Sequence, residues 1–302
     1  MTLRFPLVYP PALKPGDRVA VVAPAGACRA EALAPGLAVL RDFGLAPVPS
    51  EALYQRHRYL AGEDDLRAEA LMAAFDDPAI SGIICARGGY GSLRLLSRLD
   101  FSRIAAHPKR LVGFSDISAL LWAVCRRAGL VCFHGPTVAS LAQADPETVA
   151  AFRAGVMDGA QISLKLTAAR VLTAGEARGY LCGGNLTTLC HLIGTDFAPR
   201  FEGGVVVFED RGEAPYRIDR MLTQMRLAGV LDGVRAVVLG DFTDCGKEAD
   251  LWRVFEDLLA DLGVPVVAGS GIGHGPRNLT WPLGLPVRLD AARAVLEVAG
   301  GG

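Results

Sequence analysis

Short apolar runs alternate with helix-patterned segments through the first half of the chain, and this alternation constrains the fold more than any other feature. Asp17–Ala23, Ile80–Cys85 and Arg110–Phe114 are short, largely apolar runs, as strands buried on both faces of a sheet require. Ala30–Phe43 and Asp64–Phe75 carry apolar residues at helical spacing. Strands separated by helices in this way predict βαβ units and a mostly parallel sheet with helices on both faces.

The alternation is interrupted between two predicted domains. Residues 151–175 are polar and lack a strong period, so we predict a linker there between an N-terminal domain over residues 1–150 and a C-terminal domain over residues 176–302. The second half is predicted to open with a glycine-rich turn at residues 182–185 and to carry a glycine-rich loop at residues 269–275. The predicted fold class is α/β, with a Rossmann-like or flavodoxin-like first domain.

Composition excludes several classes of protein. The net charge is −1, so we expect no nucleic-acid partner and no binding to anionic membranes. No uninterrupted apolar run approaches the roughly 18 residues that span a bilayer, and the proline-broken N-terminus does not fit a secretory signal.

The 7 cysteines include no C-x-x-C pair and lie partly in apolar runs, which predicts buried, reduced thiols in a cytoplasmic protein. No Cys/His cluster has metal-ligand spacing, so no metal site is expected.

Ser115 is the first candidate for chemistry. It stands between the strand-like run that ends at Phe114 and a segment with apolar residues at helical spacing. A serine on such a strand-to-helix turn is exposed at the carboxyl end of the sheet, where backbone N–H groups can stabilise an oxyanion. Of the G-x-S-x-G pattern typical of such turns, only the first glycine, Gly113, is present. A helix N-cap is the alternative, because serine is favoured there.

Two further residues would complete a triad in the order Ser, Glu, His. Glu209 ends the apolar run 205–209, where a carboxylate can fix the tautomer of an imidazole, and a solvated acidic turn is the alternative. His274 has glycine on both sides, which leaves its imidazole accessible. A phosphate-binding loop is the competing explanation, but the G-K-[ST] of a P-loop is missing. His134, which follows another strand-like run, is the rival for the base.

A glycine-rich turn at residues 87–91 follows the strand-like run Ile80–Cys85. Two adjacent glycines, Gly88 and Gly89, allow a tight turn whose N–H groups face the carboxyl edge of the sheet, where α/β enzymes bind ligands. An anion nest and an oxyanion hole both fit this pattern, and a plain turn is the alternative.

These residues, taken in order, resemble the LD-carboxypeptidases, the muramoyltetrapeptide carboxypeptidase family of serine peptidases, which also includes the microcin C self-immunity proteins. The resemblance spans nearly the whole chain. Its motifs are Leu13–Asp17, Val22–Pro24, Arg58–Gly62, Arg87–Gly91, Gly113–Ile117, His134–Pro136, Gly183–Leu186, Glu209–Asp210, Tyr216–Arg220, Gly273–His274 and Pro282–Gly284.

The resemblance implies a role for each candidate. The family's nucleophile falls on Ser115, its glutamate on Glu209 and its histidine on His274. Backbone N–H groups of Gly89 and Asp116 would form the oxyanion hole. The resemblance also implies no metal, no cofactor, a homodimer, and a smaller C-terminal α/β domain that meets the N-terminal domain at the active-site cleft.

Substrate-binding residues follow from the same resemblance and from the chemistry. Asn185 would line the pocket. A carboxypeptidase must bind the terminal carboxylate of its substrate, and a bidentate arginine is the usual means. Arg87 and Arg217 are the candidates for that contact.

The implied activity is release of the terminal D-Ala from murein tetrapeptides, L-Ala-γ-D-Glu-diaminopimelate-D-Ala, in cytoplasmic murein recycling. The immunity branch, which hydrolyses aminoacyl- or peptidyl-sulfamoyl nucleotides, is the alternative. Its members tend to carry an aromatic-bearing loop, whereas residues 158–179 contain no Trp, which favours the murein peptide. A non-catalytic ligand-binding protein is a third interpretation, and it would tolerate loss of the Ser115 hydroxyl.

Overall fold

The first sheet is mostly parallel, as the alternation of strands and helices predicts. The computed structural model describes residues 7–159 and 162–300. This sheet has six strands in the order β12-β5-β4-β3-β1-β2, and only the edge strand β12 pairs antiparallel. Its strands are β1 (Arg18–Val22), β2 (Ala46–Pro49), β3 (Gly82–Cys85), β4 (Arg110–Gly113), β5 (Phe133–His134) and β12 (Trp281–Pro282).

The second sheet has eight strands in the order β6-β14-β13-β8-β9-β10-β11-β7. Its centre, from β8 to β11, is parallel, and antiparallel strands flank this centre on both sides. Its strands are β6 (Ile162–Lys165), β7 (Thr167–Thr173), β8 (Glu176–Asn185), β9 (Gly204–Arg211), β10 (Ala236–Thr243), β11 (Val266–Gly273), β13 (Pro286–Asp290) and β14 (Val295–Val298). Two sheets of this kind confirm the α/β fold class.

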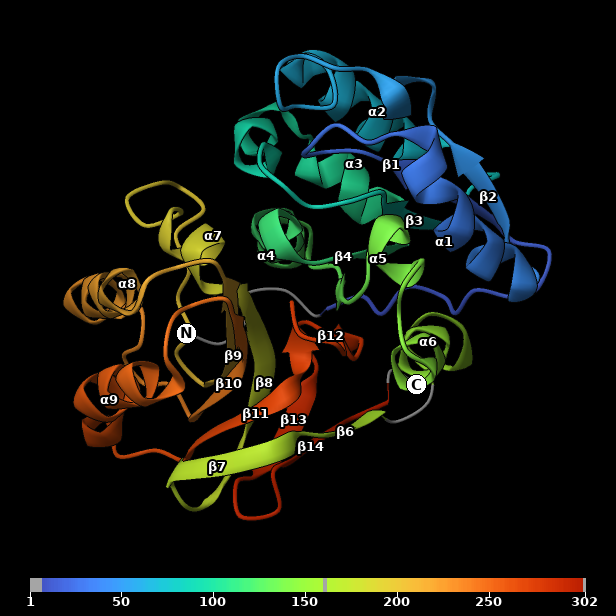
Figure 1. Ribbon diagram of the computed structural model, residues 1–302. Coiled ribbons are helices and arrows are strands. Elements are labelled where there is room, and N and C mark those ends of the chain that lie inside the picture. The colour runs from blue at the N-terminus through green and yellow to red at the C-terminus, as the bar shows by residue number, and fades with distance from the viewer. Residues whose placement is uncertain (1–6, 160–161, 301–302) are drawn as a thin grey trace.

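Helices pack around each sheet (Figure 1). The elements around the first sheet are α1 (Ala30–Asp42), α2 (Asp64–Asp76), α3 (Phe101–Ala106), α4 (Ser118–Ala128), α5 (Val138–Leu141) and α6 (Pro146–Arg153), with short 3₁₀ segments at Glu51–Tyr54, Ser92–Arg98 and Ser115–Ile117 and a π-turn at Ala154–Asp158. Those beside the second sheet are α7 (Leu186–Cys190), α8 (Pro215–Leu227), α9 (Glu248–Leu259) and a 3₁₀ turn at Ala260–Leu262.

Three segments are more regular than the sequence predicts. Residues 151–175, the predicted linker, contain the end of α6 and the strands β6 and β7, apart from residues 160–161, which lie outside the described residues. The predicted turn at residues 182–185 is the end of β8, and most of the predicted loop at residues 269–275 belongs to β11. Most of β7 is exposed, so this edge strand lacks the apolar alternation that reveals a strand in a sequence.

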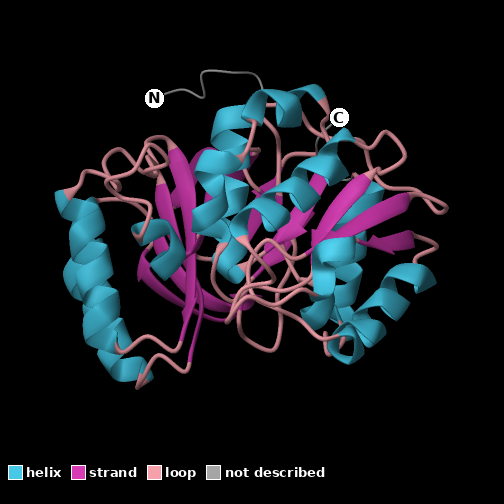
Figure 2. Cartoon of the chain, turned by 90° about the horizontal axis from the view of Figure 1, so that it is seen from above, coloured by secondary structure: helices cyan, strands magenta, loops and turns pink. Residues whose placement is uncertain are grey.

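Strand pairing and hydrogen bonds join the two sheets, in addition to the chain that connects them. β12 leaves the second half and pairs with β5 through Trp281 opposite His134. From the other side, the indole Nε1 of Trp122 on α4 donates to the carbonyl of Phe197 at 3.0 Å. Ser118 Oγ at the start of α4 accepts the N–H of Asn185, the last residue of β8, at 3.0 Å. Figure 2 shows loops gathered between the two groups of strands.

The apolar runs form the core. Val21, Ile84 and Val112 of the first sheet and Val206 and Val238 of the second are fully buried. All seven cysteines are free thiols, and all but Cys28, which is partly buried, are buried as the apolar runs predict. Among residues 7–159 and 162–300, no helix combines the length and the hydropathy that a membrane-spanning helix needs.

Candidate active site

The turn from β4 to α4 holds Ser115 in a strained backbone conformation. Its φ is 63°, in the left-handed region that residues other than Gly, Asn and Asp rarely adopt. Its side chain is not a cap: the residue before α4 is Ile117, and that helix start has no side-chain capping bond. A strained residue on a sharp strand-to-helix turn is typical of a nucleophile rather than of an N-cap serine.

Close packing on two sides fixes the position of this turn. A Cβ on Gly88 would lie 2.8 Å from Ser115 Cβ and 2.9 Å from Ser115 Oγ. A Cβ on Gly113 would lie 2.7 Å from Ile117 Cγ2. Glycine at position 113 therefore makes room for the bulky Ile117 that replaces the second glycine of the G-x-S-x-G pattern.

Glu209 and His274 form a hydrogen-bonded pair at the ends of two strands of the second sheet. His274 Nδ1 lies 2.6 Å from Glu209 Oε2. The Glu209 side chain is fully buried, and this burial raises the pKa of the carboxyl group, while the hydrogen bond from His274 opposes the rise. Gly273 has a φ of 115°, and a Cβ there would lie 2.5 Å from Glu209 Oε2. Only glycine therefore lets the chain pass so close to the carboxylate.

One pocket brings the predicted residues together. It has a volume of about 540 Å³, and Ser115, His274, Gly89, Asp116 and Asn185 all line it. The imidazole of His274 also packs on the ring of Phe114, with 4.8 Å between the ring centroids. Because Nδ1 of His274 faces Glu209, Nε2 is the ring nitrogen that takes no part in this pair.

His134, the rival for the base, is fully buried. Its ring stacks on Trp281, with 4.9 Å between centroids and an interplanar angle of 18°. Burial, followed by the nearby His274, lowers the pKa of His134 to about 3. His134 is not among the residues that line the pocket. A neutral, enclosed imidazole of this kind supports the packing beneath Phe114 and is poorly placed to take a proton from Ser115.

Comparison with known proteins identifies the family. Two family models match the chain, the LD-carboxypeptidase N-terminal domain over residues 19–135 and the LD-carboxypeptidase C-terminal domain over residues 178–289. The chain belongs to the LD-carboxypeptidase family. This membership makes it a serine-type LD-carboxypeptidase, and the resemblance seen in the sequence is confirmed.

Individual relatives agree with the family models. A carboxypeptidase homologue from Streptomyces coelicolor is 44% identical over 302 residues, covering 97% of this chain and 96% of the relative. The murein tetrapeptide carboxypeptidase of Pseudomonas aeruginosa is 36% identical over 291 residues, covering 91% and 94%. The crystal structure of muramoyltetrapeptide carboxypeptidase from Oxalobacter formigenes superposes with a TM-score of 0.85 at 31% identity, covering 93% of this chain and 98% of that one.

The immunity branch is related more distantly. The microcin C7 self-immunity protein MccF of Escherichia coli is 26% identical over 289 residues, covering 84% of each chain. A structure of MccF in complex with glutamyl sulfamoyl guanosine superposes with a TM-score of 0.88 at 23% identity, covering 97% of this chain and 98% of that one. At this identity the likeness shows a shared fold.

The remaining sequence-predicted residues differ in their surroundings. Arg87 is exposed in the cleft, and its Nη1 donates to the carbonyl of Ala27 at 3.0 Å. Asn185 caps α7, since its Oδ1 accepts the N–H of Thr188 at 3.0 Å. Arg217 is not among the residues that line the 540 Å³ pocket, and it lies 3.3 Å from Glu213, which does line it.

Two carboxylates that support the site were not predicted. Asp210 is buried and accepts hydrogen bonds from Asn185 Nδ2 at 3.1 Å and from the N–H of Thr187 at 2.8 Å. Asp241 accepts the N–H of Gly271 at 3.0 Å, and a Cβ on Gly275 would lie 2.4 Å from its carboxyl carbon. Asp241 therefore braces the chain on both sides of His274. The acidic pair Glu209–Asp210 was a sequence signal for the first, whereas Asp241 gave none.

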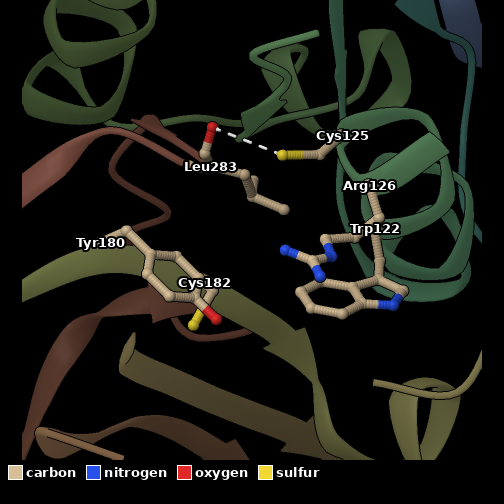
Figure 3. Close-up of a pocket in the computed structure, with 7 residues that line it drawn as sticks. Trp122, Cys125, Arg126, Tyr180, Cys182 and Leu283 are labelled. Atoms are coloured by element: carbon tan, nitrogen blue, oxygen red, sulfur yellow. Dashed lines mark hydrogen bonds between the residues drawn. The ribbon is translucent and has the colours of Figure 1, made fainter. Parts of the chain in front are cut away.

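A separate pocket lies between α4 and β8 (Figure 3). Trp122, Cys125 and Arg126 of α4 face Tyr180 and Cys182 of β8 across it. Burial raises the pKa of Cys125 to about 12, so this thiol is not activated. In the part of the chain that the structure describes, no group of three or more His, Cys, Asp or Glu side chains is arranged to hold a metal ion.

Proposed function

We propose that this LD-carboxypeptidase releases the terminal D-Ala from murein tetrapeptides through the triad Ser115, His274 and Glu209. The observation that carries the proposal is the pairing of His274 with the buried Glu209 at 2.6 Å beside a pocket that Ser115 also lines. The murein tetrapeptide carboxypeptidase of Pseudomonas aeruginosa, at 36% identity, supports the choice of substrate.

The proposed reaction follows acyl transfer to a serine. His274 Nε2 takes the proton from Ser115 Oγ as the oxygen attacks the peptide carbonyl carbon, and Glu209 stabilises the resulting imidazolium. The N–H groups of Gly89 and Asp116 are assigned to the oxyanion, and in comparable sites removal of one such donor costs about 3–4 kcal/mol. The C–N bond breaks as the leaving amine takes the proton from His274. Water then attacks the ester, which frees the acid and returns a proton to Ser115.

Recognition of the substrate carboxylate is assigned to Arg87, which is exposed in the cleft and has Nη1 held by the carbonyl of Ala27. Arg217 remains the second candidate, acting beside Glu213. Asn185 is assigned to the pocket wall, where its Nδ2 donates to Asp210 at 3.1 Å. We expect Arg87→Gln to raise KM more than it lowers kcat, because a contact made equally in ground and transition states changes binding alone.

The experiment measures D-Ala release from the free tetrapeptide by wild-type protein and by Ser115→Ala. We expect release by the wild type and a loss of at least about 10³-fold in the variant. Release by the variant at the wild-type rate would overturn the Ser115 mechanism. Hydrolysis of a glutamyl-sulfamoyl nucleotide with no D-Ala release would favour the immunity-type reaction, the alternative raised by the relationship to MccF.

The place and assembly of the enzyme are also proposals. We propose that it acts in the cytoplasm on peptides recovered from murein, in keeping with its buried, reduced cysteines. We further propose a homodimer, as the resemblance to the family implies. Sedimentation equilibrium of the purified chain measures the assembly directly, and a monomer at micromolar concentration would contradict it.

A further inference from the structure

Three neighbouring strands of the first sheet, β4, β3 and β1, run parallel and end at the same edge. The segment after β4 carries Ser115, and the turn after β3 carries Gly89, whose N–H is assigned to the oxyanion. The segment after β1, residues 23–27, has no part in the proposed reaction. Because β3 is the middle strand of the three, its turn lies between the other two segments.

Gly26 packs backbone against backbone on the turn after β3. Its N–H donates to the carbonyl of Gly88 at 3.1 Å. A Cβ on Gly26 would lie 2.9 Å from that carbonyl oxygen, and a Cβ on Gly89 would lie 3.2 Å from Gly26 Cα. On the other side, Gly88 packs against Ser115. Only glycine at position 26 therefore permits this contact without displacing the carbonyl of Gly88.

This hydrogen bond determines the direction of the Gly89 N–H. The peptide bond between Gly88 and Gly89 is trans, and in a planar trans peptide the C=O and the following N–H point in opposite directions. Because the carbonyl of Gly88 points at Gly26, the N–H of Gly89 points away from Gly26. Within residues 7–159 and 162–300, this N–H donates to no protein acceptor, and Gly89 lines the same pocket as Ser115. The donor is therefore free for a substrate oxygen.

The turn at residues 57–61 holds the segment that contains Gly26. Ala61 N donates to the carbonyl of Ala25 at 3.0 Å, and Ala27 N donates to the carbonyl of Tyr59 at 3.1 Å. These two bonds lie on either side of Gly26 in the sequence. They fix the backbone from which Gly26 reaches the carbonyl of Gly88.

A buried arginine joins the same segment to the turn after β3. The side chain of Arg67 on α2 is fully buried, and its Nη1 donates to the carbonyl of Pro24 and, at 3.0 Å, to that of Gly91. A buried charge is costly unless it is paired and hydrogen-bonded, and Asp64 Oδ1, 2.5 Å from Nη2, supplies the partner. Because Pro24 and Gly91 belong to the two segments in contact, Arg67 fixes how far apart these segments lie.

We propose that Gly26 is a positioning residue for acyl transfer to Ser115. Its N–H holds the carbonyl of Gly88 and thereby aims the N–H of Gly89 at the oxygen of the reacting carbonyl group. The inference rests on the proposed function for the assignment of the Gly89 N–H to the oxyanion. Gly26 acts only through the peptide group between Gly88 and Gly89.

The test is Gly26→Ala, which keeps the N–H and adds one methyl group against the carbonyl of Gly88. Loss of one oxyanion donor costs about 10²–10³-fold in kcat, and a donor that is turned aside costs less, so we expect kcat to fall by roughly tenfold or more. KM should change by less than about twofold, because the oxyanion forms only in the transition state. The same Cβ would lie 3.4 Å from Arg87 Nε. A raised KM at unchanged kcat would mean that only Arg87 is displaced, and it would overturn the proposal.

The matched control is Gly82→Ala on β3, the strand that leads into the same turn. Its Cβ would lie 3.0 Å from Leu13 Cδ2, the end of a flexible side chain, and would not contact the turn. We expect a lower midpoint of thermal unfolding with kcat unchanged. An equal fall in kcat in both variants would mean that crowding anywhere in this sheet lowers activity. That result, or wild-type kcat in Gly26→Ala, would overturn the role of Gly26.

Amide hydrogen exchange of the wild-type protein measures the contact without any substitution. We expect the Gly26 N–H to exchange at least about 100-fold more slowly than in an unstructured peptide, because the carbonyl of Gly88 holds it. The Gly89 N–H, which has no protein acceptor, should exchange faster than that of Gly26. Exchange of Gly26 as fast as in an unstructured peptide would overturn the proposal, even if Gly26→Ala proved too unstable to assay.

These outcomes can be separated from failure of the proposed function. Hydrolysis of a murein tetrapeptide and of a glutamyl-sulfamoyl nucleotide both require attack on a carbonyl group and form an oxyanion. The kcat of Gly26→Ala is therefore compared on whichever of the two the wild type hydrolyses. Hydrolysis of the nucleotide alone would contradict the proposed release of D-Ala, and the role of Gly26 would be decided on that substrate. Hydrolysis of neither would overturn both.

Discussion

Ser115 combines the hydroxyl that we propose as the nucleophile with an unfavourable backbone conformation, so the contributions of the two can be measured separately. Ser115→Ala removes the hydroxyl and keeps the strain of φ 63°, whereas Ser115→Gly removes both. We expect both variants to be inactive and the glycine variant to be more stable than the alanine variant by about 1 kcal/mol. Differential scanning calorimetry of the pair measures this difference. Equal midpoints would mean that the turn stores no strain at this residue.

The buried Glu209 carries an energetic penalty, which its proposed role beside His274 would explain. Because burial raises the pKa of this carboxyl group in the folded state, ionising it opposes folding, and its contribution to stability falls as pH rises from the ordinary glutamate pKa through the raised one. Glu209→Gln has no such titration. We expect the variant to gain stability relative to the wild type as pH rises across that window, while kcat falls by about 10³–10⁴-fold.

Unfolding by urea at several pH values, alongside D-Ala release, measures both effects. A difference in stability that does not change with pH would contradict the raised pKa. Wild-type activity in Glu209→Gln would contradict the role of the carboxylate in orienting His274.

At the scale of elements, the end of β11 positions His274, the proposed base. Asp241 on β10 accepts the N–H of Gly271 at 3.0 Å. We expect Asp241→Ala to lower the free energy of unfolding by about 1–3 kcal/mol, because a buried N–H loses its acceptor, and to lower kcat through disorder of His274. Asp257→Ala, on the exposed face of α9, is the matched control and should leave both unchanged. Wild-type kcat in Asp241→Ala would show that the strand end needs no such support.

The sequence predicts those features that residues close together in the chain determine, and it misses those that depend on contacts between distant residues. The βαβ pattern, and His274 between two glycines, are visible because adjacent residues determine them. The positive φ of Ser115 is not, since it depends on contacts with Gly88 and on Ile117 packing against Gly113. The role of Asp241 could not be predicted for a similar reason. Its position follows a shift in the register between β10 and β11, and strand pairing between residues distant in sequence determines that shift.

At the scale of the whole molecule, shared elements couple the two sheets. Trp281 of β12 stacks on His134 inside the first sheet, and Trp122 of α4 binds the carbonyl of Phe197 beside the second. We therefore expect one cooperative thermal transition, with calorimetric and van't Hoff enthalpies equal, although the chain is predicted to have two domains. Two resolved transitions would contradict this coupling.

β12 comes from the C-terminal half of the sequence but pairs in the first sheet, and this limits where the enzyme can be cut to exchange its halves with those of a relative. His274 lies between β11 of the second sheet and β12 of the first, so the segment that carries His274 also joins the two sheets. A hybrid made by exchanging halves at residue 150 with a relative would have to match a foreign β12 to a native β5. The two halves therefore cannot be exchanged independently between relatives. We expect active chimeras only where both paired strands, β5 and β12, come from the same parent, which means Phe133, His134, Trp281 and Pro282.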